Sequence, residues 1–396
     1  MENSGEYTQE ELWILLKRRA IKCTKLANES NVFNGPICIK KQDRCILQLD
    51  EKGCEIEKFF IKKLPKTGIN LTDNQKIDLV NQVLSKISIK DISYQSLLAE
   101  LRNQTANVIT YLFGLTNLKL NIEKTFKIDD QIQIGNSRYV QDDSIFNDSV
   151  LQSDFFKEEN NYILVSVNGP DDKETARKAE NQANIFINVL NGLYCNRSEP
   201  ISIMTEIEKN TESSVFFYLK KYKNCNWRES YNTRPDKILP YMVLNVSELK
   251  IVRKLYENRG KDNKYSKLIF TLNWLGKSMK ETDYGSAFLE VIIGLECIAE
   301  KQYNGMVSPS INFQISYFVA IILGENKEDR KLIIKEMKKL YMKRSQIVHD
   351  GKSSITYENY KNIFHLIKKL IYTIIYDKTL KNIEDLNSWV DEQLLS

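Results

Sequence analysis

Residues 356–377 read TYENYKNIFHLIKKLIYTIIYD, and this stretch decides the fold class of the C-terminal part of the chain. Its apolar side chains recur every three or four residues, at Tyr360, Ile363, Phe364, Ile367, Leu370, Ile371, Ile374 and Ile375. This spacing places them on one stripe of a helix, and so continuous a stripe is typical of a helix in a bundle. The sequence therefore predicts a long helix here with one buried side.

The segments on both sides of this helix have the same character. We expect further helices near residues 246–258, 262–280, 284–302, 311–323, 327–348 and 384–395. Short runs that contain glycine separate them, such as Asn304-Gly305 and Asp350-Gly351, and such runs typically interrupt helices. The sequence therefore predicts an all-helical domain over residues 241–396.

The first 240 residues alternate between helical and strand-like patterns. Thr8 and Glu11 have the spacing of a capping box, which predicts that a helix begins there. Further helices are expected over 72–87, 94–115 and 173–193, and strands over 36–41, 44–50, 54–63, 118–140 (with a turn at Gly135-Asn136), 162–167 and 215–221. The predicted fold class is α+β: a mixed N-terminal domain over 1–240, divisible near residue 150, before an all-α domain.

Composition limits the chemistry that this chain can perform. Among 396 residues there are two histidines, His349 and His365, and seven cysteines without a C-x-x-C pair. A site that needs several histidines of one chain is excluded, and a zinc site of the usual spacing is not expected. We expect no metal and no other cofactor. There is no apolar run of about 18 residues and no signal-peptide pattern, so we expect a cytoplasmic protein without a membrane partner.

The stretch that carries candidate chemistry is residues 338–351, KKLYMKRSQIVHDG. From Arg330 to Lys352 there are eight Lys or Arg residues against two acidic residues, a local net charge of +6. Such a helix suits a phosphate backbone, although charge alone also fits the solvated face of an ordinary bundle helix. Arg344 and His349 are five residues apart, about 140° around an ideal helix. They meet only if the helix loosens near Asp350-Gly351.

These residues resemble a known family. Arg344–Gly351, RSQIVHDG, is similar to the R-x4-6-H motif of HEPN-domain proteins. The upstream segment Ala287–Ile298, AFLEVIIGLECI, resembles the Leu-Glu helix of the Apea-like branch of that family, a branch associated with prokaryotic antiviral defence and abortive infection. The resemblance covers residues 245–380 and does not extend to the N-terminal part.

The resemblance implies a metal-independent endoribonuclease toxin or effector whose active site forms between two HEPN domains of a homodimer. It assigns phosphate stabilisation to Arg344 and proton transfer to His349. Attack by the RNA 2′-OH needs a base, an acid and positive charge, and a dimer supplies two histidines. Accessory roles are assigned to Ser345, Asp350 and Glu296. Contacts with the phosphate backbone of RNA are expected from the side chains of Lys339, Lys343 and Lys352.

Two departures from the motif leave a second interpretation open. Ser345 stands where family members often have Asn, Asp or His, and Asp350 precedes the glycine. Asp350 either orients His349 or caps the helix, and Glu296 either orients Arg344 or makes a structural contact. The alternative is a non-catalytic HEPN-type module that binds RNA or a protein. A weaker, third hypothesis places a metal-dependent nuclease near Arg234–Asp236.

The remaining features receive structural or open interpretations. His365 follows Phe364 on the 356–377 helix and is expected to be a packed or half-exposed flank residue. The N-terminal domain is expected to act as a sensor or regulator. Its partner could be a phage-derived trigger or an antitoxin, and the RNA target could be tRNA, mRNA or another RNA.

Overall fold

The computed structural model describes residues 8–29, 39–41, 44–46, 51–64, 71–84, 92–106, 108–142, 160–170, 173–195, 200–203, 218–221, 228–230, 242–261, 263–299, 310–350 and 355–395. This part of the chain is mostly helical with a small sheet, which confirms the α+β class. Two compact units are present. The first contains Met1–Ile109, Val167–Lys178 and Tyr222–Asn224, and the second contains Thr110–Ser166, Ala179–Lys221 and Cys225–Ser396.

Four helices form most of the first unit: α1 (Gln9–Glu29), α2 (Glu51–Lys63), α3 (Asp73–Leu84) and α4 (Tyr94–Ala106). β1 (Ile39–Lys41) and β2 (Arg44–Ile46) pair in an antiparallel hairpin. The predicted capping box starts α1, because the Thr8 backbone N–H donates to Glu11 Oε2 at 2.7 Å. Trp13 stacks on Phe60 in the core, with ring centroids 5.8 Å apart.

One predicted strand of this unit is wrong. Residues 54–63 belong to α2, and the buried residues Glu57, Phe60, Ile61 and Leu64 follow helical spacing of three and four. An alternating pattern would have placed Phe59 and Ile61 on the same side of a strand. Packing against α1 and α3 stabilises the helix, because it buries the apolar face that helical spacing creates.

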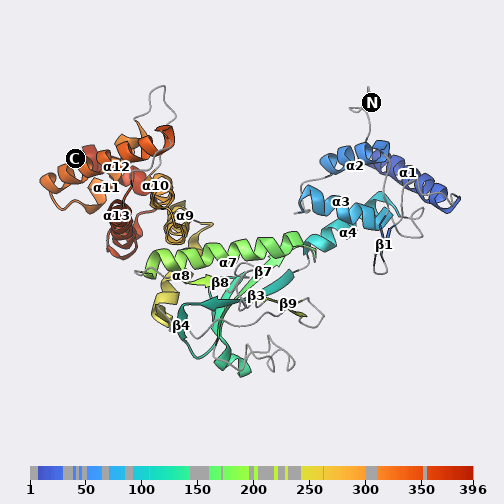
Figure 1. Ribbon diagram of the computed structural model, residues 1–396, viewed down its shortest axis with the longest axis horizontal. Helices are drawn as coiled ribbons and strands as arrows, with labels where there is room; N and C mark the ends of the chain where they lie inside the picture. Colours follow the sequence, from blue (N-terminus) through green and yellow to red (C-terminus); the bar gives the residue numbers. More distant parts are fainter. Residues whose placement is uncertain are drawn as a thin grey trace. The chain divides into compact units, whose positions relative to one another are not determined.

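The sheet of the second unit has the order β10-β9-β3-β7-β6-β5, with β8 also paired to β3. Its strands are β3 (Val108–Thr116), β5 (Phe126–Lys127), β6 (Ile132–Asn136), β7 (Asn161–Asn168), β8 (Ser202–Ile203), β9 (Tyr218–Lys221) and β10 (Arg228–Ser230). The helix α7 (Lys173–Tyr194) crosses one face of the sheet (Figure 1). The short 3-10 helix η2 (Ser137–Asp142) follows β6.

Two sequence predictions fail in this region. Residues 108–115 are part of β3, so the helix predicted over 94–115 ends at Ala106. Gly135 and Asn136 form no turn, because both pair with β7, at Tyr162 and Asn161. Glycine is needed at 135 for space: a Cβ there would lie 2.4 Å from the Tyr162 ring. The strand at 162–167 and the helix at 173–193 are confirmed.

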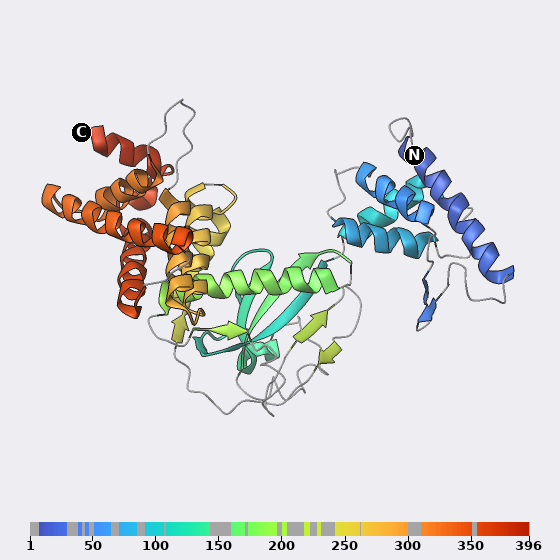
Figure 2. The same cartoon turned by 45° about the horizontal axis from the view of Figure 1, so that its top comes forward.

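The parallel pair β4 (Leu118–Asn121) and β11 (Met242–Asn245) leads into the C-terminal helices. These are α8 (Val246–Asn258), α9 (Asn263–Ser278), α10 (Tyr284–Ala299), α11 (Ile311–Leu323), α12 (Lys327–Asp350), α13 (Tyr357–Tyr376) and α14 (Leu386–Leu395), with the 3-10 helix η3 (Leu380–Asn382). Their predicted positions are confirmed, and Figure 2 shows them gathered beside one end of α7. The predicted division at residues 240 and 241 stays a prediction, and contacts group the sheet with these helices.

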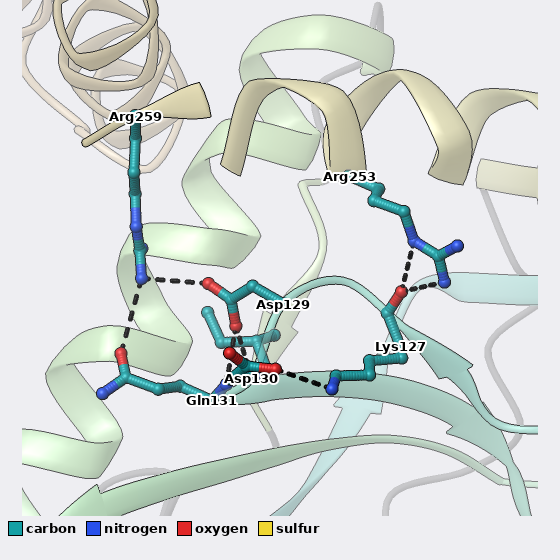
Figure 3. Close-up of polar contacts among 7 residues, drawn as sticks. Lys127, Asp129, Asp130, Gln131, Arg253 and Arg259 are labelled. Atoms are coloured by element: carbon teal, nitrogen blue, oxygen red, sulfur yellow. Dashed lines mark hydrogen bonds and ion pairs between the residues drawn. The ribbon is translucent and has the colours of Figure 1, made fainter. Parts of the chain in front are cut away.

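Polar contacts hold α8 on the loop between β5 and β6 (Figure 3). Arg259 Nη2 lies 2.9 Å from Asp129 Oδ2, and Arg253 Nε donates to the Lys127 carbonyl at 2.6 Å. Asp129 also accepts backbone hydrogen bonds from Gln131 and Ile132 through Oδ1, at 2.8 and 2.7 Å. One carboxylate therefore shapes the loop and binds the helix.

α7 and α9 approach each other closely at Gly276. A Cβ on Gly276 would lie 2.0 Å from the Asn188 carbonyl oxygen. Asn188 Nδ2 also donates to Asn273 Oδ1 at 3.0 Å. At the end of α7, Lys368 and Tyr372 of α13 donate to the carbonyls of Cys195 and Leu193 at 2.9 and 2.6 Å. Burial lowers the pKa of Lys368 to about 8.

We predict that Gly276→Ala destabilises the second unit by about 2 kcal/mol or more, because backbone atoms of α7 must move to admit the methyl group. Chemical denaturation measures the change. Gly260→Ala is the matched control, since a Cβ at Gly260 meets nothing within 4 Å. Equal stability of both variants would contradict the close approach.

A second prediction concerns Glu57, which is 6% exposed. Its pKa is raised to about 7, because burial and the charge of Asp78 outweigh the lowering by the Asn81 side chain and Lys58. The folded state therefore holds the Glu57 proton more tightly than the unfolded state does. The resulting contribution to the free energy of unfolding is complete below pH 4.5 and is lost as the pH rises through 7. Glu57→Gln should gain on the order of 1–3 kcal/mol at pH 8 and little at pH 4.5. A gain independent of pH in urea denaturation would contradict the assignment.

Candidate functional site

The helix α12 carries most of the candidate residues, and it is packed on one side only. Asn326 caps its start, accepting from the backbone N–H groups of Glu328 and Asp329 at 3.0 Å each. These two acidic residues in the first turn also favour the helix dipole. The helix packs against α11 and α10, and Met337 and Tyr341 are its buried side chains among those described. The opposite face is exposed to solvent.

Glu296 of α10 binds α12 through two side chains. The Tyr341 hydroxyl donates to Glu296 Oε1 at 2.7 Å, and Arg344 Nε lies 3.5 Å from the same oxygen. Burial and the hydrogen bond to the negatively charged Glu296 raise the pKa of Tyr341 well above its usual range, although Arg344 opposes this. Tyr341 therefore stays a neutral donor. The Arg344 side chain remains 34% exposed, so it retains donors that solvent or a ligand can reach.

His349 lies on the other side of the helix from this contact. The helix is regular through Asp350, so it does not loosen between Arg344 and His349 as the sequence-based interpretation required. Five residues of regular helix turn the chain by about 140°. Because Arg344 leans towards Glu296, His349 and Ser345 are exposed elsewhere on the helix. The structure thus brings Arg344 and Glu296 together, and it separates both from His349.

The candidate RNA-binding lysines have different surroundings. Lys343 Nζ donates to Asn359 Oδ1 at 2.7 Å, which ties α12 to the first turn of α13. Lys339 pairs with Glu336 at 2.7 Å, and both side chains are more than half exposed, so this pair contributes little stability. Lys352 lies outside the described residues, as does the side chain of Asp350.

Exposed apolar side chains accompany the basic residues of α12. Leu332 and Met342 are each 63% exposed, and Val348 is 51% exposed. Lys335, Lys338 and Ser345 on the same helix are also exposed. Mixed apolar and cationic surface of this kind can bind a second protein surface and a phosphate chain together.

Two further residues are His365, which lies outside the site, and Tyr341, which the sequence did not single out. His365 is exposed on α13, edge-on to Phe364 with ring centroids 6.0 Å apart. It lies beside the apolar stripe of α13, as expected, but it is exposed and not packed or half-exposed. Sequence reasoning assigned no role to Tyr341, the donor to Glu296. Its position three residues before Arg344 is the available signal, because such residues share a helix face.

Among the described residues, no three His, Cys, Asp or Glu side chains gather to hold a metal ion. In the same part of the chain, no helix has the length and apolar composition needed to cross a membrane. Residues 234–236 lie outside the described ranges. Comparison with protein-family models, curated proteins and solved structures gives no match for this chain.

We predict that Tyr341→Phe lowers the free energy of unfolding by about 1–3 kcal/mol, because Glu296 loses a neutral donor in a largely buried contact. Thermal or urea denaturation measures this loss. Tyr357→Phe is the control, since Tyr357 is 55% exposed. If the two variants unfold alike, the Glu296 contact does not anchor α12.

Proposed function

We propose that this chain is a metal-independent endoribonuclease of the HEPN type, acting as a cytoplasmic effector or toxin in antiviral defence or abortive infection. The proposal rests on the surface of α12. This basic helix is exposed along one side, carries an exposed histidine near its C-terminal end and holds a half-buried arginine. No cofactor is required in the proposed reaction.

The reaction assigns separate tasks to these two side chains. In the proposed mechanism the RNA 2′-OH attacks the adjacent phosphorus, and the 5′-oxygen of the next nucleotide leaves. His349 side chains take the proton from the 2′-OH and give a proton to the leaving 5′-oxygen, because an imidazole titrates near neutral pH. Arg344 donates to the non-bridging phosphate oxygens, which gain charge in the transition state. Glu296, which accepts from Tyr341, positions the Arg344 guanidinium.

A second copy of the chain supplies what one copy lacks. One histidine cannot be base and acid in the same attack, and Arg344 and His349 of one regular helix are turned about 140° apart. Two α12 helices related by a two-fold axis would bring two copies of each residue to one cleft. Exposed Leu332 and Met342 offer apolar contact for that interface. The N-terminal domain over residues 1–240, in this proposal, receives the phage-derived trigger or antitoxin.

A specific observation also favours the non-catalytic alternative. Arg344 already has a carboxylate partner, and Ser345 is a weaker proton partner than Asn, Asp or His at that position. A module of this kind would bind RNA through the exposed lysines of α12 or bind a protein through its apolar residues, without forming product.

We predict RNA cleavage by the purified chain in EDTA, with tRNA or total RNA as substrate and with an activating phage lysate where needed. His349→Ala and Arg344→Ala should each reduce the cleavage rate by roughly 10²-fold or more. His365→Ala is the matched control and should leave the rate unchanged, because His365 lies on α13 and has no role in the proposed reaction. Equal rates for the two histidine variants would contradict the proposal.

RNA binding separates the two candidate functions. Lys339→Ala should weaken binding and reduce the salt dependence of affinity by roughly one phosphate contact, whereas Lys369→Ala on α13 should not. Filter binding at several salt concentrations measures both. Binding that survives His349→Ala without any cleavage by the parent chain would favour the non-catalytic module.

A further inference from the structure

A cavity of about 260 Å³ lies among α8, α9, α13 and η3, away from the residues assigned to cleavage. Its walls are aliphatic: Ile251 and Leu255 come from α8, Leu268 from α9, and Ile374 and Ile375 from α13. Leu255, Leu268 and Ile374 are at most 2% exposed, so they belong to the packed interior. Ile251 and Ile375 are half-buried, so they lie nearer the opening.

Three lysines and two tyrosines complete the lining: Lys254, Lys264, Tyr265, Tyr376 and Lys381. No aspartate or glutamate is among these lining residues of the described chain. Lysines commonly bury their methylene stems along apolar surface and keep the ammonium group near water. An apolar hollow with cations and hydroxyl groups on its lining is therefore complementary to a molecule with an apolar body and an anionic end.

The polar side of the cavity is fixed in place. The Lys264 ammonium, in a residue 5% exposed, donates to the Lys381 carbonyl at 3.1 Å and to the Ile383 carbonyl. This contact holds η3 against α9 and so sets the position of Lys381. Two acidic groups act nearby. Burial and then the charge of Glu248 raise the pKa of Tyr376, and backbone hydrogen bonds from Leu380 and Thr379, with a smaller effect of Lys381, lower the pKa of Asp377.

The volume selects a small ligand. Drug-sized molecules occupy cavities of roughly 300–1,000 Å³, and 260 Å³ is below that range. We propose that this cavity binds a small amphiphilic anion, an aliphatic chain ending in a carboxylate or a phosphate.

α8 connects the cavity to the sheet. Residues 251, 254 and 255 of α8 line the cavity. Arg253 of the same helix and Arg259 at its C-cap bind residues of β5 and the β5–β6 loop (Figure 3). The proposal concerns binding and does not depend on the endoribonuclease activity.

Equilibrium dialysis of the full chain tests the proposal, with octanoate and octyl phosphate as probes. The neutral analogue octanol and inorganic phosphate separate the contribution of the chain from that of the charge. Ile375→Trp fills the cavity from a half-buried position, and the double variant Lys254→Gln/Lys381→Gln removes two charges without adding bulk. Lys369→Gln, on an exposed position of α13, is the control. Circular dichroism checks that each variant is folded.

We expect one saturable site per chain for at least one of the two anions, with octanol and inorganic phosphate at least tenfold weaker. Both the filled and the uncharged variants should weaken binding at least tenfold, and the control should match the parent chain. Stronger binding of one anion identifies the preferred head group. No saturable binding of either anion would overturn the proposal, as would equal binding of octanol or phosphate, or affinity unchanged in the folded cavity variants.

Discussion

The hydrogen bond from Tyr341 to Glu296 sets how α12 lies on the helices beneath it. Few side chains of this helix are buried, so its rotation about its own axis depends on a small number of directed contacts. Glu296 accepts from Tyr341 at 2.7 Å and attracts Arg344 at 3.5 Å, which directs one face inward. Because the helix stays regular to Asp350, this choice also directs His349 outward. The proposed function follows from that division between an anchored arginine and an exposed histidine.

A small number of contacts between α7 and the helices α9 and α13 also joins the sheet to the C-terminal helices. α7 covers the sheet, and Gly276 lets α9 approach its backbone so closely that no side chain fits between them. Lys368 and Tyr372 then satisfy carbonyls at the end of α7, groups that a helix leaves without internal partners. A ligand that moved the sheet would therefore act on helices of the same compact unit.

The helices could be predicted from sequence because their apolar residues recur at helical spacing over long segments, as in 311–323 and 356–377. Residues 54–63 and 108–115 could not, since short apolar runs fit a helix or a strand until their packing partners are known. Arg344 and His349 could be found from their spacing and charge. The contact of Arg344 with Glu296 brings together residues 48 positions apart, and no local pattern encodes the rotation of α12 that produces it.

The central claim is that two His349 side chains from two copies of the chain serve one reaction. It is tested most directly by co-expressing parent and His349→Ala chains in varied proportions and measuring RNA cleavage in EDTA. If both histidines of a dimer are needed, activity should follow the square of the parent fraction, falling to about one quarter when half of the chains are variant. Activity that falls in direct proportion, to about one half, would show that one histidine suffices and would contradict the account.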